Sequence, residues 1–199
     1  MSKTLYVDFR DVGFWAFDVV AATYIKFLVD AAETRMTSEA DSWLADVIQQ
    51  WRVNAAISDF GFHLDDEWTE SQKTTIVEIF QKTNDTITGI GDIPARLVDA
   101  EPIVDDLHIF LRNIDPIPHK PVVRFGKGVI DLLSDSLPAP PKGHWWYYNL
   151  ADELGTIERR DAKSRIPTTT GITNRSTRAA DDAGFEINVS RPPPGYLSR

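Results

Sequence analysis

The spacing of hydrophobic and polar positions changes near residue 14 of the chain. In residues 5–11 (LYVDFRD) three apolar residues alternate with more polar positions, which predicts a short, half-buried strand. From Phe14 to about Glu33 the apolar residues recur every three or four positions instead. That period predicts an amphipathic helix of about six turns.

Three further helices are predicted from start signals and apolar stripes. One begins near Ser38, an N-cap residue followed by acids that suit the positive end of a helix. The next follows Thr69, which fits a capping box with Gln72, and should end at the two glycines within residues 89–92. A fourth is expected over residues 102–112, which open with a proline suited to a first turn.

Prolines and short apolar runs dominate the second half of the chain. Residues 115–121 and 138–143 hold three prolines each, and both segments are predicted to be extended. The period alone does not assign the apolar runs VVRF and GVIDLL between them. Strands are predicted at residues 145–148 (WWYY) and 185–189 (FEINV), and the two could pair with each other. The Thr-, Ser- and Arg-rich stretch 161–182 is expected to be loop or disorder.

These elements predict a mainly α fold: a compact bundle of about four to five helices, a few short β-strands and an irregular C-terminal extension. Charge divides the chain in the same way. Residues 1–155 carry 13 Lys and Arg against 25 Asp and Glu, a net charge of −12, while residues 156–199 carry 8 against 5, a net charge of +3, which together give −9. We therefore expect an acidic, mainly helical domain over 1–155 and a basic, Ser/Thr-rich extension over 156–199.

Composition and charge indicate which kind of partner and which cellular compartment to expect. The acidic body favours a basic protein partner and disfavours nucleic acid, which is bound mainly through Lys and Arg. The chain has no cysteine, which favours a reducing cytoplasm over an oxidising compartment. We expect neither a signal peptide nor a membrane span, because the most apolar segment, residues 14–29, is short and interrupted by charges.

Two clusters of polar residues raise the question of catalysis or metal binding. Residues 63–67 (HLDDE) are consecutive, without the spacing of a calcium loop, and fit a solvated acidic loop before a helix. Asp105 and His108 would share one face of a helix, where an acid–base pair is geometrically possible. The chain has no GxSxG, P-loop, GxGxxG, HExxH or CxxC motif. We predict no catalytic residue, metal or cofactor, and expect that the protein is not an enzyme.

The aromatic segment 145–148 is the most informative candidate for a binding surface. As a strand it would place two aromatic residues on each face, and Trp and Tyr are enriched in interface hot spots. The acidic loop would form the rim of the same interface. The predicted partner-binding residues are Asp65, Asp66, Glu67, Trp145, Trp146, Tyr147 and Tyr148.

In size, acidity and lack of catalytic motifs the chain resembles the immunity proteins of bacterial polymorphic-toxin and contact-dependent inhibition systems. The resemblance implies a cytoplasmic protein that neutralises a cognate nuclease-like or otherwise basic toxin by binding tightly over or beside its active site. Two alternatives stay open: a hydrolase whose Asp, Glu and His residues come from scattered positions, and a structural component whose extension reaches a neighbouring subunit.

Overall fold

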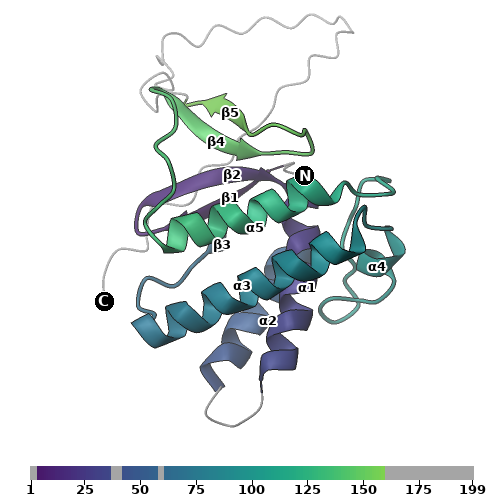
Figure 1. The fold of residues 1–199 in the computed structure, drawn as a ribbon. Helices are drawn as coiled ribbons and strands as arrows, with labels where there is room; N and C mark the ends of the chain where they lie inside the picture. The colour runs from purple at the N-terminus through teal and green to yellow at the C-terminus, as the bar shows by residue number, and fades with distance from the viewer. Residues whose placement is uncertain (1–3, 37–41, 58–60, 160–199) are drawn as a thin grey trace, which may run out of the picture.

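A five-stranded sheet is covered on one face by helices, as Figure 1 shows. The computed structural model describes residues 4–36, 42–57 and 61–159. Within these ranges the strands are β1 (Thr4–Phe9), β2 (Val12–Phe17), β3 (Phe62–His63), β4 (His144–Tyr148) and β5 (Gly155–Glu158). The helices are α1 (Asp18–Arg35), α2 (Ser42–Ala56), α3 (Glu70–Ile90), the single turn α4 (Arg96–Asp99) and α5 (His119–Leu133). The described residues form an α+β fold with five helices, which confirms the predicted fold class.

The sheet has the strand order β3-β1-β2-β4-β5. β1 and β2 form an antiparallel hairpin whose two-residue turn, Arg10 and Asp11, has positive φ angles of 47° and 65°. Two positive φ values are typical of a turn whose twist matches that of the flanking strands. β3 runs parallel to β1 and β4 runs parallel to β2, whereas β5 is antiparallel to β4. The N-terminal hairpin therefore lies at the centre of the sheet.

The first helix begins later than the sequence predicts. Residues 12–17 form β2, in which Phe14 and Ala16 are buried and Trp15 and Phe17 are half-buried. The prediction of a helix from Phe14 is wrong. Phe14 and Phe17 are three residues apart, which fits one face of a helix, but in β2 they lie on opposite faces of the sheet. From Asp18 onward α1 is helical, and its central position among α2, α3 and α5 buries almost its whole first half.

Two predicted helices are confirmed. α2 carries the expected apolar stripe, although its predicted start near Ser38 lies outside the described residues. α3 begins with the predicted capping box: the Thr69 hydroxyl accepts from the backbone N–H of Gln72, and the Gln72 side chain accepts from the backbone N–H of Thr69. The helix ends at Ile90, and Gly91 follows with a φ of 75°.

The segment between α3 and α5, residues 91–118, is hereafter called the connector. The helix predicted over residues 102–112 is wrong, because these residues form turns and irregular backbone. The extended conformation predicted up to residue 121 is also wrong at its end, since α5 starts at His119. Pro121 lies in the first turn of α5, where the missing N–H breaks no hydrogen bond. VVRF and GVIDLL thus belong to one continuous helix.

The predicted strand at residues 145–148 is confirmed as β4. Both of its edges are occupied, by β2 on one side and β5 on the other. The FEINV strand at residues 185–189, its suggested pairing with WWYY and the stretch 161–182 lie outside the described residues. β5 spans residue 155, where the sequence analysis placed the boundary between body and extension.

Candidate partner-binding surface

The four aromatic residues of β4 divide between the two faces of the sheet. Tyr148 faces the helices, is 3% exposed and contacts Phe14 at a centroid distance of 4.3 Å. Its ring crosses Gly128 of α5, where a Cβ atom would lie 2.4 Å from the tyrosine oxygen. Trp146 points to the same side, and its Nε1 donates a hydrogen bond to the carbonyl of Pro138 at 2.7 Å. These two predicted contact residues contribute mainly to packing.

Trp145 and Tyr147 lie on the opposite face of the sheet, hereafter called the outer face. Tyr6 joins them from β1 and Trp15 from β2, and all four side chains are half-buried. The Tyr6 ring centroid is 5.0 Å from that of Trp15 and 5.7 Å from that of Trp145, the second pair meeting edge to face. Rings at these distances pack favourably and form a rigid aromatic cluster.

An arginine already stacks on this cluster. The guanidinium carbon of Arg159 lies 3.8 Å from the ring centroid of Trp145, within the range of a cation–π contact. Its Nε donates to the carbonyl of His144 at 2.9 Å, and its backbone N–H donates to Gly143 at 2.7 Å. The aromatic rings of the outer face can therefore bind a planar cation such as a guanidinium group.

Burial and nearby charges raise the pKa values of the two tyrosines of the outer face. Burial is the main reason why the pKa of Tyr6 is raised to about 12; the charges of Asp8 and Asp11 also raise it, and that of Arg159 lowers it. Burial also raises the pKa of Tyr147, with a smaller contribution from Asp18. Both phenols are therefore protonated at neutral pH and can act as hydrogen-bond donors to a partner.

The predicted acidic loop lies at the same end of the sheet as the start of β4. The loop follows β3, and Asp65, Asp66 and Glu67 are all exposed. Asp66 accepts a hydrogen bond at 2.9 Å from the backbone N–H of Arg10 in the β1–β2 turn, and Asp65 accepts one at 2.8 Å from Glu67. Three strand spacings, about 14 Å, separate this edge of the sheet from β4. One protein interface can cover both segments.

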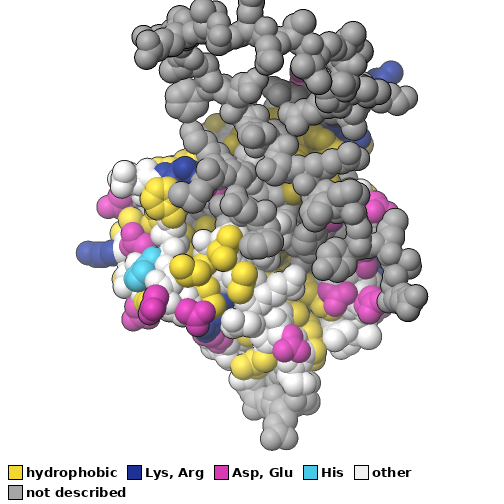
Figure 2. All heavy atoms as spheres, turned by 180° about the vertical axis from the view of Figure 1, so that it is seen from behind, with side chains coloured by type: hydrophobic (Ala, Val, Ile, Leu, Met, Phe, Trp, Pro, Cys, Tyr) yellow, Lys and Arg dark blue, Asp and Glu magenta, His cyan; other side chains and the backbone are white. Residues whose placement is uncertain are grey.

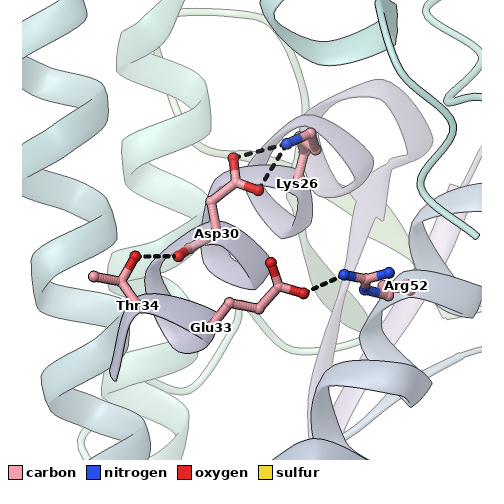
Figure 3. A network of polar contacts seen from close by, with 5 residues as sticks. All are labelled: Lys26, Asp30, Glu33, Thr34 and Arg52. Carbon is pink, nitrogen blue, oxygen red and sulfur yellow. Dashed lines mark hydrogen bonds and ion pairs between the residues drawn. The ribbon is translucent and has the colours of Figure 1, made fainter. Parts of the chain in front are cut away.

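Other acids are engaged in ion pairs within α1 and between α1 and α2. In Figure 3 the Lys26 ammonium contacts both oxygens of Asp30 at 2.7 Å, while Arg52 of α2 pairs with Glu33 of α1. The Thr34 hydroxyl donates to the carbonyl of Asp30 at 2.8 Å. The Glu33–Arg52 pair joins α1 to α2, whereas the Lys26–Asp30 pair lies within α1.

The polar clusters considered for catalysis are arranged differently from the expectation. Asp105 has a φ of 47° in a turn, so it does not share a helical face with His108, whose Nδ1 instead contacts the carbonyl of Asp99 at 2.9 Å. His119 hydrogen-bonds to Asp92 at 3.0 Å and lowers the pKa of that carboxyl. Across residues 4–36, 42–57 and 61–159, no three His, Asp or Glu residues are grouped so that they could hold a metal ion.

Sequence reasoning missed three members of the outer face. Tyr6 was assigned to the polar side of the first strand, although its ring belongs to the aromatic cluster. Trp15 was placed in a helix, and Arg159 was treated as part of the extension. The signal that could have identified the strand carrying Trp15 is the short, almost continuous apolar run of residues 12–17, which follows the polar pair Arg10 and Asp11.

Comparison of the chain with protein-family models, curated proteins and solved structures gives no match. Among the described helices, none combines the length and apolar character needed to span a bilayer.

Proposed function

We propose that this protein binds and neutralises a basic protein partner through the outer face of its sheet. The observation that carries the proposal is the stacking of Arg159 on Trp145 at 3.8 Å. An arginine of a partner could use the same aromatic surface, with the exposed carboxylates of the 65–67 loop contributing attraction at the rim. Trp145, Tyr147, Asp65, Asp66 and Glu67 are the proposed contacts from the sequence analysis, and Tyr6 and Trp15 extend them.

The chemistry of the outer face suits such a role. Trp, Tyr and Arg dominate the energetics of protein interfaces, because their large side chains bury area with little loss of conformational freedom. The aromatic cluster is held on central strands of the sheet, so little ordering is needed when a partner binds.

The charge of the body supports the same kind of partner. Residues 1–155 carry a net charge of −12, which attracts a basic protein over a distance and accelerates association. Rapid capture is an advantage when the partner is a toxin, and in this respect the proposal agrees with the resemblance to immunity proteins. An interface of standard size would use about 20–30 residues of this chain.

The direct test is co-purification with the product of the adjacent open reading frame, together with rescue of its toxicity by co-expression. We expect Trp145→Ala to weaken binding about tenfold or more. Met36→Ala is the matched control, because Met36 is 40% exposed at the end of α1, away from the sheet. A neighbouring gene product that is not toxic and does not co-purify would be excluded as the partner. An equal loss of binding in Trp145→Ala and Met36→Ala would exclude the outer face as the binding surface.

Arg159 offers a second, more specific test. If an arginine of the partner takes the position over Trp145, Arg159→Gln removes a competitor and should strengthen binding a few-fold. The association rate should also fall as salt rises toward physiological strength, where the screening length is about 8 Å. If Arg159→Gln instead weakens binding, Arg159 itself contacts the partner, and no arginine of the partner replaces it over the Trp145 ring.

A further inference from the structure

The connector, residues 91–118, is a closed loop whose two ends are tied together. Ile93 and Ile117 exchange backbone hydrogen bonds of 2.9 and 2.8 Å. The carboxylate of Asp115 also accepts from the backbone N–H of Ala95 at 2.9 Å. These bonds hold the base of the loop beside the end of α3 and the start of α5 (Figure 1).

The interior of the loop is anchored in the protein. Six of its apolar side chains are no more than 5% exposed: Ile93, Val98, Ile103, Ile109, Leu111 and Ile117. Arg112 adds an ion pair with the buried carboxylate of Asp18 at the start of α1. The connector is therefore held in one conformation although it contains almost no regular structure.

Its outward side exposes large apolar residues. Leu97 is 45% exposed, Leu107 46% and Phe110 61%, which makes Phe110 the most exposed large hydrophobic residue of the described chain. Beside Phe110 lies an open hollow of about 280 Å³, lined by residues that include Ala95, Ile109 and Asn113. Apolar side chains gathered on a rigid surface mark sites of interaction more often than isolated ones do.

The connector carries more exposed acids than basic residues. In the rear view of Figure 2, hydrophobic side chains lie directly beside Asp and Glu side chains on the flank that the connector occupies. The two basic residues of the connector are Arg96 and Arg112, and Arg112 is held by Asp18. Its six acids are all exposed: Asp92, Asp99, Glu101, Asp105, Asp106 and Asp115.

We propose that the outward side of the connector is a second docking surface, which receives a basic amphipathic segment of a partner protein. A large apolar side chain of that segment covers Phe110 and Leu107, and flanking Lys or Arg residues meet the surrounding carboxylates. The exposed acids favour a positively charged partner. The exposed apolar residues favour a partner segment that also presents an apolar side chain. The proposal stands on the connector alone and does not depend on the outer face.

The test is an NMR titration of the full-length, isotope-labelled protein with three synthetic peptides of equal length. One peptide is an amphipathic Lys/Leu helix, the second replaces Lys with Glu, and the third replaces Leu with Ser. We expect the Lys/Leu peptide to shift the amide signals of residues 97–113, and each of the other two to bind at least about tenfold more weakly.

Matched variants separate the contribution of apolar contact to peptide binding from that of charge. Phe110→Ser should weaken binding of the Lys/Leu peptide about tenfold, whereas Met36→Ser, another exposed apolar position, should leave it unchanged. The pair Asp105→Asn and Asp106→Asn should weaken binding several-fold and remove most of its salt dependence. Asp46→Asn with Asp85→Asn is the control, because it removes equal charge from exposed positions of α2 and α3.

Three results would overturn the proposal. Equal binding of the Glu/Leu peptide would remove the role of charge, and signal changes confined to the sheet would place the site elsewhere. Concentration-dependent dimerisation abolished by Phe110→Ser would identify a second copy of this chain as the occupant. Native-like spectra of each variant without peptide keep these results separate from a folding defect.

Discussion

Asp18 and Arg112 are 94 residues apart in the chain and form a two-point ion pair. The Nε of Arg112 lies 2.9 Å from one carboxylate oxygen and 3.1 Å from the other, and Nη2 makes a further contact. Asp18 is only 5% exposed, and it also accepts a hydrogen bond from the backbone N–H of Val19 at 2.8 Å. The pair fastens the connector to the junction of β2 and α1, and the carboxylate in turn raises the pKa of Arg112.

Asp18→Asn should therefore destabilise the protein and loosen the connector. We expect a loss of about 2–3 kcal/mol in unfolding free energy, less than for a fully buried pair because the Arg112 side chain is 21% exposed. Urea denaturation measures this loss, and faster amide hydrogen exchange at residues 109–114 should accompany it. Asp30→Asn is the control: its carboxylate is 51% exposed beside Lys26 and should contribute less than about 0.5 kcal/mol. Equal effects of the two substitutions would contradict the special role of Asp18.

Gly128→Ala should destabilise the protein by about 1–3 kcal/mol, because its methyl group would overlap the Tyr148 ring. Thermal or urea unfolding measures the change. Gly89→Ala in α3 is the matched control, since no atom lies within 4 Å of its added Cβ. Alanine there should stabilise the protein by about 0.5–1 kcal/mol. Opposite signs at two helical glycines are the expected result, and a neutral Gly128→Ala would show that sheet and helix can move apart.

Thr69→Ala should cost about 1 kcal/mol of stability, because it removes the hydroxyl that satisfies the backbone N–H of Gln72. Thr74→Ala tests an exposed threonine in the same helix, whose hydroxyl only returns to the carbonyl of Glu70. That change should be neutral or slightly stabilising, since alanine has the higher helix propensity. Chemical denaturation of both variants checks the difference, and comparable losses would argue against a cap-specific effect.

The alkaline titration of Tyr6 gives a prediction about pH. Because the pKa of Tyr6 is raised from 10.0 to about 12 in the folded protein, the folded state holds this proton more tightly than the unfolded state does. The resulting stability is fully present below pH 10 and is lost as the pH rises toward 12. Urea denaturation at about pH 9 and about pH 11 should show a smaller decline for Tyr6→Phe than for the unchanged protein. Ultraviolet titration of tyrosinate in both proteins should assign the missing transition to pH values near 12. A transition near 10 would show that Tyr6 is solvated.

Local signals in the sequence predicted the regular elements that depend on local chemistry. The capping box at Thr69 fixed the start of α3, and the two glycines near residue 90 marked its end. Aromatic residues at 145–148 indicated a strand, although its neighbours β2 and β5 were not predicted, and the suggested partner at residues 185–189 lies outside the described residues. The acidic loop is exposed as expected, while the positions of its carboxylates beside the β1–β2 turn depend on how β3 pairs.

The conformation of the connector could not be predicted from local sequence signals. Its residues 103, 107, 110 and 111 have helical spacing, but Ile103 is buried while Leu107 and Phe110 face outward. The conformation is decided by distant contacts, chiefly the Ile93–Ile117 hydrogen bonds and the ion pair between Arg112 and Asp18. Trp15 was likewise misplaced because β2 gains its partners from β1 and from β4, which is more than 125 residues away.

The position of the N-terminal hairpin at the centre of the sheet sets the timing of folding during synthesis. β2 is made before every described helix, whereas the strand that covers its free edge, β4, is made only after all of them. Until then a strand edge bearing Trp15 and Phe17 stays open, and an open, apolar edge is prone to pair with other chains. A nascent chain of this protein therefore depends on β4 to protect the edge of β2, and truncation before residue 144 should produce aggregates rather than a smaller folded unit.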